Sequence, residues 1–252
     1  MSKKIRPYLS LVIPAFKEAE RLPNTLQTVR RYVLKWPFPS EILVVVEPSP
    51  DATLPVAEAA RQNFPELRVI ANAVHRGKGH AVRTGMLEAK GQITFFTDAD
   101  LSTPLSDLEV ALQIFERERQ VDVIVGSRQH PESKILQHQS PTREWMGKTF
   151  NRIVRLLAGL DLEDTQCGFK GFRQATAREI FSRQRTDGFA FDVEVLLLAR
   201  MMGFTVREMP VHWSNSTESK VRVIRDSLRM LLEVLAMRRL VNRTVHDYPF
   251  YR

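Results

Sequence analysis

Short, uninterrupted apolar segments alternate with helical patterns throughout the first half of the chain. The apolar segments are Leu9–Ile13, Ile42–Val46, Leu67–Ile70, Ile93–Thr97 and Val121–Val125. The helical patterns between them cover roughly Pro23–Leu34, Thr53–Gln62, Gly79–Ala89 and Pro104–Glu116. Strands that are apolar on both faces and are joined by helices build parallel sheets with helices on both sides. The alternation therefore predicts an α/β fold with a mostly parallel sheet covered by helices on both faces.

The alternation ends after Gly126, and the second half follows a different pattern. The polar segment Ser127–Pro141 predicts a long, mobile loop. Helices are expected at Glu144–Leu157 and Phe191–Met202, and short strands at Phe169–Phe172 and Thr205–Glu208. We interpret residues 1–218 as a single domain with two halves, 1–126 and 127–218, and residues 219–252 as a C-terminal extension.

The charge balance is basic, with 37 Lys and Arg against 29 Asp and Glu. This balance favours anionic partners such as nucleotide phosphates, lipid phosphates or an acidic membrane surface. Nucleic acid is not expected, because the chain lacks base-stacking motifs and paired Cys or His ligands. The single cysteine, Cys167, excludes an internal disulfide, and this predicts a cytoplasmic location.

No segment approaches about 18 consecutive apolar residues, and the N-terminal residues lack a signal-peptide core, so we expect no membrane span. The segment Ser219–Arg243 instead carries Val221, Ile224, Leu228, Leu231 and Leu235 at helical spacing, with seven Lys or Arg and two acids. Such a basic amphipathic helix can lie on an anionic membrane, which predicts peripheral contact with its cytoplasmic face. The same pattern also fits a helix packed on the domain with a solvated basic face.

Asp98-Ala99-Asp100 follows directly after the apolar run Ile93–Thr97. Two carboxylates thus stand at the C-terminal end of a buried strand, where open α/β sheets bind their ligands. Hard oxygen donors at this spacing suit Mg²⁺ or Mn²⁺ carrying a diphosphate. Asp-x-Asp also occurs in ordinary loops, so its position at the strand end is what favours a metal site.

Three earlier turns carry polar groups that suit the rest of a nucleotide. Glu18 and Glu47 follow the first two strands, where their carboxylates can accept hydrogen bonds from a base or ribose. Gly77-Lys78-Gly79 opens the third helix, and such a turn directs backbone N–H groups and the helix dipole toward a phosphate. Together with the aspartate pair, these turns predict a nucleotide diphosphate site at one edge of the sheet.

A series of motifs covers the chain in order from about Leu9 to Leu240. The motifs are Val12–Glu18, Arg76–Met86, Asp98–Ser102, Gly126–Arg128, Asp164–Lys170, Phe191–Glu194 and Ser219-Lys220. In these motifs the chain resembles an inverting family 2 glycosyltransferase of the GT-A fold, in the branch of dolichyl-phosphate β-glucosyltransferases and dolichol-phosphate mannose synthases. His212-Trp213 before Ser219-Lys220 is more similar to the glucosyl members.

The resemblance implies roles for individual residues. The nucleotide-sugar pocket would be lined by Pro14, Phe16, Glu18, Val45, Glu47, Lys78, Asp98 and Ala99. The metal would be held by Asp100 and Ser102, the acceptor by Arg128, Arg143, Trp213 and Lys220, and catalysis would depend on Asp98, Asp100, Arg128 and Lys220. The family usually has Asp-Asp-Gly-Ser after the second strand, whereas this chain has Val46-Glu47-Pro48-Ser49, which puts the donor base in doubt.

The implied reaction moves a hexose, in the first place glucose from UDP-glucose, to a polyprenyl or dolichyl phosphate. A phosphate monoester has a second pKa of about 6 and is already anionic near neutral pH, so cations are expected on the acceptor side and not a general base. Asp192 and Glu194 could form a base and its partner, but Asp192 equally fits a helix cap.

Alternatives remain open at this point. The donor could be GDP-mannose, the acceptor could be soluble, or the protein could be an inactive nucleotide-sugar-binding protein. Assembly into a homo-oligomer also stays open. A sugar nucleotidyltransferase is disfavoured, because its glycine-rich loop normally follows the first strand, where this chain has Pro14-Ala15-Phe16.

Overall fold

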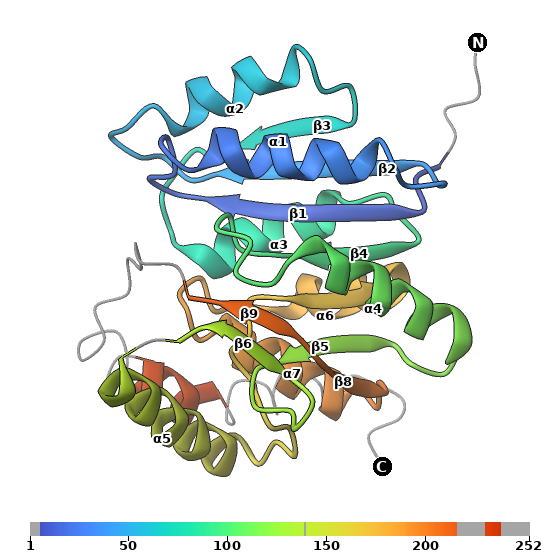
Figure 1. Ribbon diagram of the computed structural model, residues 1–252. Helices are drawn as coiled ribbons and strands as arrows, with labels where there is room; N and C mark the ends of the chain where they lie inside the picture. The colour runs from blue at the N-terminus through green and yellow to red at the C-terminus, as the bar shows by residue number, and fades with distance from the viewer. Residues whose placement is uncertain (1–5, 139, 216–229, 238–252) are drawn as a thin grey trace.

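The computed structural model of the protein describes residues 6–138, 140–215 and 230–237. The central sheet contains β1 (Leu9–Ala15), β2 (Ser40–Val46), β3 (Leu67–Ala71), β4 (Ile93–Phe96), β5 (Val123–Ser127), β7 (Lys170–Arg173) and β8 (Val206–Pro210). These strands lie in the order β3-β2-β1-β4-β7-β5-β8 (Figure 1). Neighbouring strands are parallel except at β7, which is antiparallel to both β4 and β5. The predicted α/β fold with a mostly parallel sheet is confirmed.

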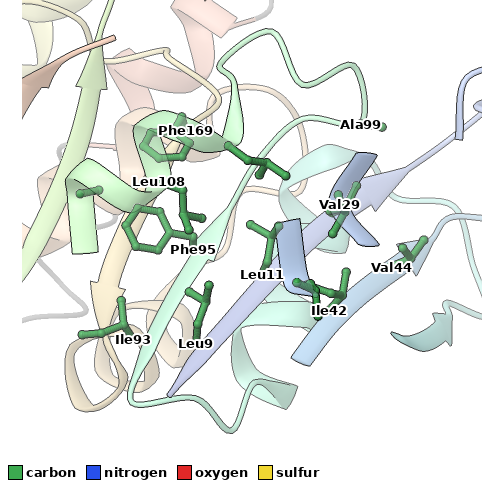
Figure 2. Close-up of a cluster of buried hydrophobic side chains, with 14 of the residues drawn as sticks. Leu9, Leu11, Val29, Ile42, Val44, Ile93, Phe95, Ala99, Leu108 and Phe169 are labelled. Atoms are coloured by element: carbon green, nitrogen blue, oxygen red, sulfur yellow. The ribbon is translucent and has the colours of Figure 1, made fainter. Parts of the chain in front are cut away.

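The central strands β1, β2 and β4 are largely apolar, and both of their faces are buried. Along β1, Leu9 and Leu11 point into the core on one side of the sheet, whereas Val12 points into the core on the other. Figure 2 shows the first of these cores, where the two leucines lie near Phe95 and Phe169. Alternate residues of one strand therefore serve two separate hydrophobic layers.

Helices cover both faces of the sheet (Figure 1). The core shown in Figure 2 includes apolar residues of α1 (Leu22–Val33), α2 (Thr53–Arg61) and α4 (Leu105–Arg117). The opposite core includes residues of α3 (Lys78–Glu88), α5 (Pro141–Ala158), α6 (Gln174–Arg183) and α7 (Phe191–Met201). None of the helices in the described ranges is long and apolar enough to cross a membrane.

Residues 230–237 of the C-terminal extension are helical. Met230, Val234 and Met237 are buried in the same core as α5 and α7, whereas Leu235 is half exposed. Over these residues the face packed on the domain consists of the two methionines and Val234, and the predicted stripe through Leu231 and Leu235 is not part of it. The rest of the predicted basic helix lies outside the described residues.

One expectation was wrong in the second half of the chain, and one helix there was not predicted. The segment Ser127–Pro141, predicted as a loop, contains β6 (Lys134–Gln137), which pairs in parallel with β9 (His212–Ser214). Its partner lies far away in sequence, so the four residues of β6 carry no local signal of the pairing. Helix α6 was not predicted, although Ala177, Ile180 and Phe181 have helical spacing and are buried.

Strands β1 to β4 are parallel, so their C-terminal ends meet at one edge of the sheet. The loops that carry Glu18, Glu47, Lys78 and Asp98 all begin at this edge. The fold thus brings the predicted phosphate, nucleoside and metal residues to one side of the molecule, as expected at the C-terminal edge of an open α/β sheet.

Candidate functional site

An ion pair connects the aspartate motif to the first residue of α3. Lys78 Nζ lies 2.5 Å from Asp98 Oδ1. Burial opposes the charge on this lysine, but the carboxylates of Asp98 and Asp192 raise the pKa of Lys78 above its ordinary value. A permanent cation therefore stands beside Asp98 at the N-terminus of a helix, which is a favourable place for a phosphate group.

Asp100 belongs to a second charged group at the same edge. Its Oδ1 accepts a hydrogen bond of 2.9 Å from the backbone N–H of Ser102, and its Oδ2 lies 3.9 Å from an Arg21 guanidinium nitrogen. The same guanidinium lies 3.5 Å from Glu18 Oε2. Arg21, which the sequence analysis did not identify, therefore connects two predicted site residues.

The carboxylates fit a divalent cation that shares its ligands with a substrate. The side chains of Asp98 and Asp100 are 35% and 20% exposed, so both reach the surface. Within the described residues no group of three or more His, Cys, Asp or Glu could hold a metal. Mg²⁺ in proteins is commonly held by one or two carboxylates plus phosphate oxygens and water, and this donor set meets that pattern. Asp100 and Asp98 would hold the ion, whereas Ser102 contributes its backbone N–H to Asp100.

Glu47 has a different environment from the one expected. It is 1% exposed, and its two oxygens contact protein groups only. Those groups are the Asn72 amide, the backbone N–H of Arg76 and Gly77, and Nδ1 of His75 and His80. Burial favours the neutral acid, but these contacts hold the pKa of Glu47 below its ordinary value. The Glu47 carboxylate therefore holds the loop before α3 in place. Both of its oxygens are hydrogen-bonded to protein groups of this region and do not face a ligand.

Two other predicted pocket residues are also buried. Val45 is fully buried in the core behind α3, and Ala99 is 5% exposed with its carbonyl oxygen accepting a hydrogen bond from Thr25 Oγ1. Central strands and tight loops direct such small apolar side chains inward, so neither side chain reaches the site edge. Pro14 and Phe16 are partly exposed at the end of β1.

Phe16 forms a ring contact with the Glu47 network. Its ring is stacked on His75, with 4.1 Å between centroids and 10° between planes. His75 Nδ1 in turn lies 3.0 Å from Glu47 Oε2. The loop after β1 and the loop before α3 are therefore held together through an aromatic pair over a buried carboxylate.

Replacing Glu47 with glutamine is expected to lower the free energy of unfolding by about 1–3 kcal/mol, because an amide nitrogen would replace one oxygen that now faces only donors. Urea unfolding measures this change. Glu58→Gln is the matched control, since Glu58 forms only a surface ion pair with Arg61 and should change stability by less than about 0.5 kcal/mol. Equal effects of the two substitutions would contradict the assigned role of Glu47.

Arg128 and Trp213, two of the predicted acceptor residues, lie together. The Arg128 guanidinium carbon is 5.6 Å from the centre of the Trp213 ring. The guanidinium also forms a two-point contact with Asp164, with Nε–Oδ2 at 2.6 Å and Nη2–Oδ1 at 3.0 Å. Asp164 is fully buried, and although burial favours its neutral form, Arg128 lowers its pKa. The fold therefore fixes the orientation of Arg128 through a carboxylate that the sequence analysis had not assigned.

A buried charge pair connects β7 to α7. Lys170 is completely buried, and its Nζ lies 2.5 Å from Asp192 Oδ1 and 2.7 Å from the carbonyl oxygen of Cys167. The pairing explains why Asp192 is not positioned as a free base. Burial also raises the pKa of the Cys167 thiol to about 11, which argues against a nucleophilic role.

The segment 164–168 connects the two halves of the site. Asp164 holds Arg128 at one end, and Gly168 packs so closely against the Asp98 carboxylate that a Cβ at this position would overlap it. Lys220 lies outside the described residues, and so does the side chain of Arg143 in α5. Of the four residues predicted to bind the acceptor, the structure therefore brings Arg128 and Trp213 together, and the segment 164–168 connects them to the aspartate motif.

Comparison with known proteins identifies the family of the chain. The model of the family described as "Glycosyl transferase family 2" matches residues 10–181. The dolichyl-phosphate β-glucosyltransferase of Drosophila melanogaster is 37% identical over 224 residues, 84% of this chain and 69% of that protein. The human dolichyl-phosphate β-glucosyltransferase is 32% identical over 241 residues, 91% of this chain and 74% of that protein.

A solved structure supports the same fold. Mycobacterium tuberculosis glucosyl-3-phosphoglycerate synthase superposes with a TM-score of 0.66 at 15% identity, over 92% of this chain and 80% of that one. At this identity the likeness concerns the fold alone. The match to the family model covers more than half of the chain, and the sequence relatives cover most of it. This chain belongs to glycosyl transferase family 2.

Proposed function

We propose that this protein transfers glucose from UDP-glucose to a polyprenyl or dolichyl phosphate, with inversion at the anomeric carbon. The observation that carries the proposal is the strand-end group in which Asp98, Asp100 and Lys78 stand together. The names of the relatives, dolichyl-phosphate β-glucosyltransferases from several organisms, support glucose as the sugar and a lipid phosphate as the acceptor.

On the donor side, Lys78 and the N-terminus of α3 would bind the diphosphate of the nucleotide sugar. Asp100 and Asp98 would hold Mg²⁺ or Mn²⁺, which supplies positive charge against the departing diphosphate. Crystals of the mycobacterial synthase with Mg²⁺ and UDP, and with Mn²⁺ and UDP-glucose, support this use of a metal and donor. Glu18, which Arg21 links to Asp100, and Phe16, which stacks on His75, would line the nucleoside part.

On the acceptor side, Arg128 would bind the lipid phosphate with Trp213 beside it. An anionic phosphate oxygen attacks the anomeric carbon on the face opposite the leaving group, and the bond from that carbon to the diphosphate oxygen breaks. UDP leaves with the bonding electrons. Because the attacking phosphate oxygen is already deprotonated near neutral pH, no proton has to be removed from the acceptor. Arg143 and Lys220 are proposed as further cations for the same phosphate.

A lipid acceptor has to be met at a membrane surface. We therefore propose peripheral contact on the cytoplasmic face of a membrane. The basic balance of the chain, 37 Lys and Arg against 29 Asp and Glu, supports attraction to anionic lipid.

A transfer assay tests the proposal. Radiolabelled sugar should move from UDP-glucose into the organic phase in the presence of a polyprenyl phosphate, with GDP-mannose and UDP-galactose as comparison donors. A tenfold or greater preference for GDP-mannose would replace the proposed donor. Tight binding of UDP-glucose without transfer to any phosphate acceptor would instead indicate an inactive binding protein.

Removal of the metal is expected to lower the rate by about a hundredfold or more, because the leaving diphosphate would lose its counter-charge. The measurement is the initial rate after chelation by EDTA, followed by addition of Mn²⁺ or Mg²⁺ in excess. Full recovery is expected with either ion. An unchanged rate in EDTA would contradict the metal-dependent assignment.

A further inference from the structure

Helix α5 has two apolar faces, and only one of them is buried. Val154 is 0% exposed and Ala158 is 3% exposed, and both belong to the core that also contains α7. In contrast, Trp145 is 69% exposed and Leu156 is 75% exposed on the same helix. These two are among the most exposed large apolar side chains in the part of the chain that the structure describes.

The exposed apolar residues of α5 form one stripe. Trp145, Met146, Ile153 and Leu156 fall within an arc of about 100° around the helix axis, since each residue advances the helix by about 100°. Met146 and Ile153 are each 40% exposed. The stripe is turned away from the buried face and is interrupted only by the exposed Thr149, so α5 presents an apolar surface that the described part of the protein does not cover.

Basic residues lie along one edge of this stripe. Lys148, Arg152 and Arg155 fall on the adjoining arc of the same helix. The single acid of α5, Glu144, has its carboxylate 2.7 Å from His138 Nδ1. The surroundings of the stripe are therefore positive, which suits an anionic partner better than a second copy of the chain with the same charge.

We propose that the exposed stripe of α5 seats in the interfacial layer of an anionic membrane. Trp145 and Leu156 enter the boundary between headgroups and acyl chains, while Lys148 and Arg152 extend to the lipid phosphates. Such a combination of apolar stripe, tryptophan and flanking cations is typical of helices that lie in the plane of a membrane surface.

The location of α5 agrees with this role. The helix follows β6, and β6 pairs with β9, which carries Trp213 of the acceptor group. In Figure 1, α5 lies at the opposite end of the molecule from α2 and β3. Leu232 and Leu235 of the neighbouring C-terminal helical segment are also 61% and 51% exposed. The inference rests on the proposed function, because a lipid phosphate acceptor is what brings the enzyme to a membrane.

Flotation of the full chain with vesicles tests the inference. Wild-type protein is expected to float with vesicles of phosphatidylcholine and phosphatidylserine, and less with phosphatidylcholine alone or in high salt. Trp145→Glu and Leu156→Glu should each weaken vesicle affinity about tenfold, since each replaces a membrane-seated apolar group with an anion. Leu34→Glu is the matched control, because Leu34 is 70% exposed at the end of α1, away from the stripe of α5. The vesicle affinity of the Leu34→Glu variant should stay within about twofold of that of the wild-type protein.

A second readout separates this inference from the proposed function. Both α5 variants should keep wild-type thermal stability and wild-type transfer to a short, water-soluble isoprenyl phosphate. Vesicle binding without transfer would refute the proposed function and leave the inference standing. Wild-type vesicle affinity in both α5 variants, or an equal loss in Leu34→Glu, would overturn the inference. Loss of a wild-type dimer in Trp145→Glu with unchanged vesicle affinity would assign the stripe to self-association and also overturn it.

Discussion

Replacing Asp100 with asparagine is expected to lower kcat/KM for glucosyl transfer by about a thousandfold or more. The side chain of Asp100 is one-fifth exposed at the C-terminal end of β4, and its Oδ1 accepts the backbone N–H of Ser102. Asparagine keeps this acceptor and the shape of the loop, but it removes the negative charge that would hold the metal. The loss should therefore fall on catalysis and not on folding.

Two measurements separate these effects. The unfolding free energy of Asp100→Asn should stay within about 1 kcal/mol of wild type, because the removed charge contacts Arg21 only at 3.9 Å. Asp161→Asn is the control, since Asp161 is exposed in the loop after α5 and should leave kcat/KM unchanged. Near-normal turnover of Asp100→Asn at high metal concentration would refute the assigned role of Asp100.

The second large effect is expected at Gly168. A Cβ at this position would overlap the Asp98 carboxylate, which now lies 2.5 Å from Lys78 Nζ. The carboxylate is the end of a movable side chain, so Gly168→Ala should displace it from Lys78 without unfolding the protein. A displacement of about 1 Å at a reacting centre can cost about a hundredfold, and we expect a loss of that size in kcat/KM.

Gly147→Ala is the matched control for this substitution. A Cβ on Gly147 in α5 meets nothing within 4 Å, so the same chemical change should leave turnover intact and stabilise the helix slightly. Steady-state rates and thermal unfolding of the two variants test the comparison. Equal activity of Gly168→Ala and Gly147→Ala would show that the close contact with Asp98 has no catalytic importance.

The first half of the fold could be predicted because its signals are local. Each buried strand of a parallel sheet is a continuous apolar run, and each helix between strands has its own spacing, so the elements from β1 to β5 lie within a few residues of their expected positions. The pairing of β6 with β9 depends on residues that lie far apart in sequence, and β6 has a mostly exposed, four-residue sequence. Nothing in Lys134–Gln137 alone distinguishes it from a loop.

In the candidate site, too, some contacts could be predicted from the sequence and others depend on residues that only the fold brings together. Lys78 and Asp98 could be predicted to meet, because parallel strands deliver their C-terminal ends to one edge. The partners of Glu47 could not be predicted, because Asn72 and the backbone of Arg76 belong to a loop whose path depends on the folded chain, and that loop also sets where His80 of α3 lies. A carboxylate at a strand end looks the same in sequence whether it faces a ligand or a buried network.

The orientation of Arg128 could not be predicted from the sequence either. Arg128 was expected to bind a phosphate, but its orientation depends on Asp164, which is fully buried and lies 36 residues away. A buried carboxylate paired with an arginine leaves no periodic pattern in the sequence. Its motif drew attention to the segment 164–168, but only the folded chain shows that this segment also contacts Asp98 through Gly168.

A crystal structure of the protein with UDP and Mn²⁺ tests the central claim most directly. We expect the ion bound to Asp100 and the diphosphate within hydrogen-bonding reach of Lys78 Nζ, at the edge where β1 and β4 end. A diphosphate and ion bound elsewhere, for example in the cavity lined by Arg76, Arg185 and Asp187, with Asp100 and Lys78 free of both, would contradict the account.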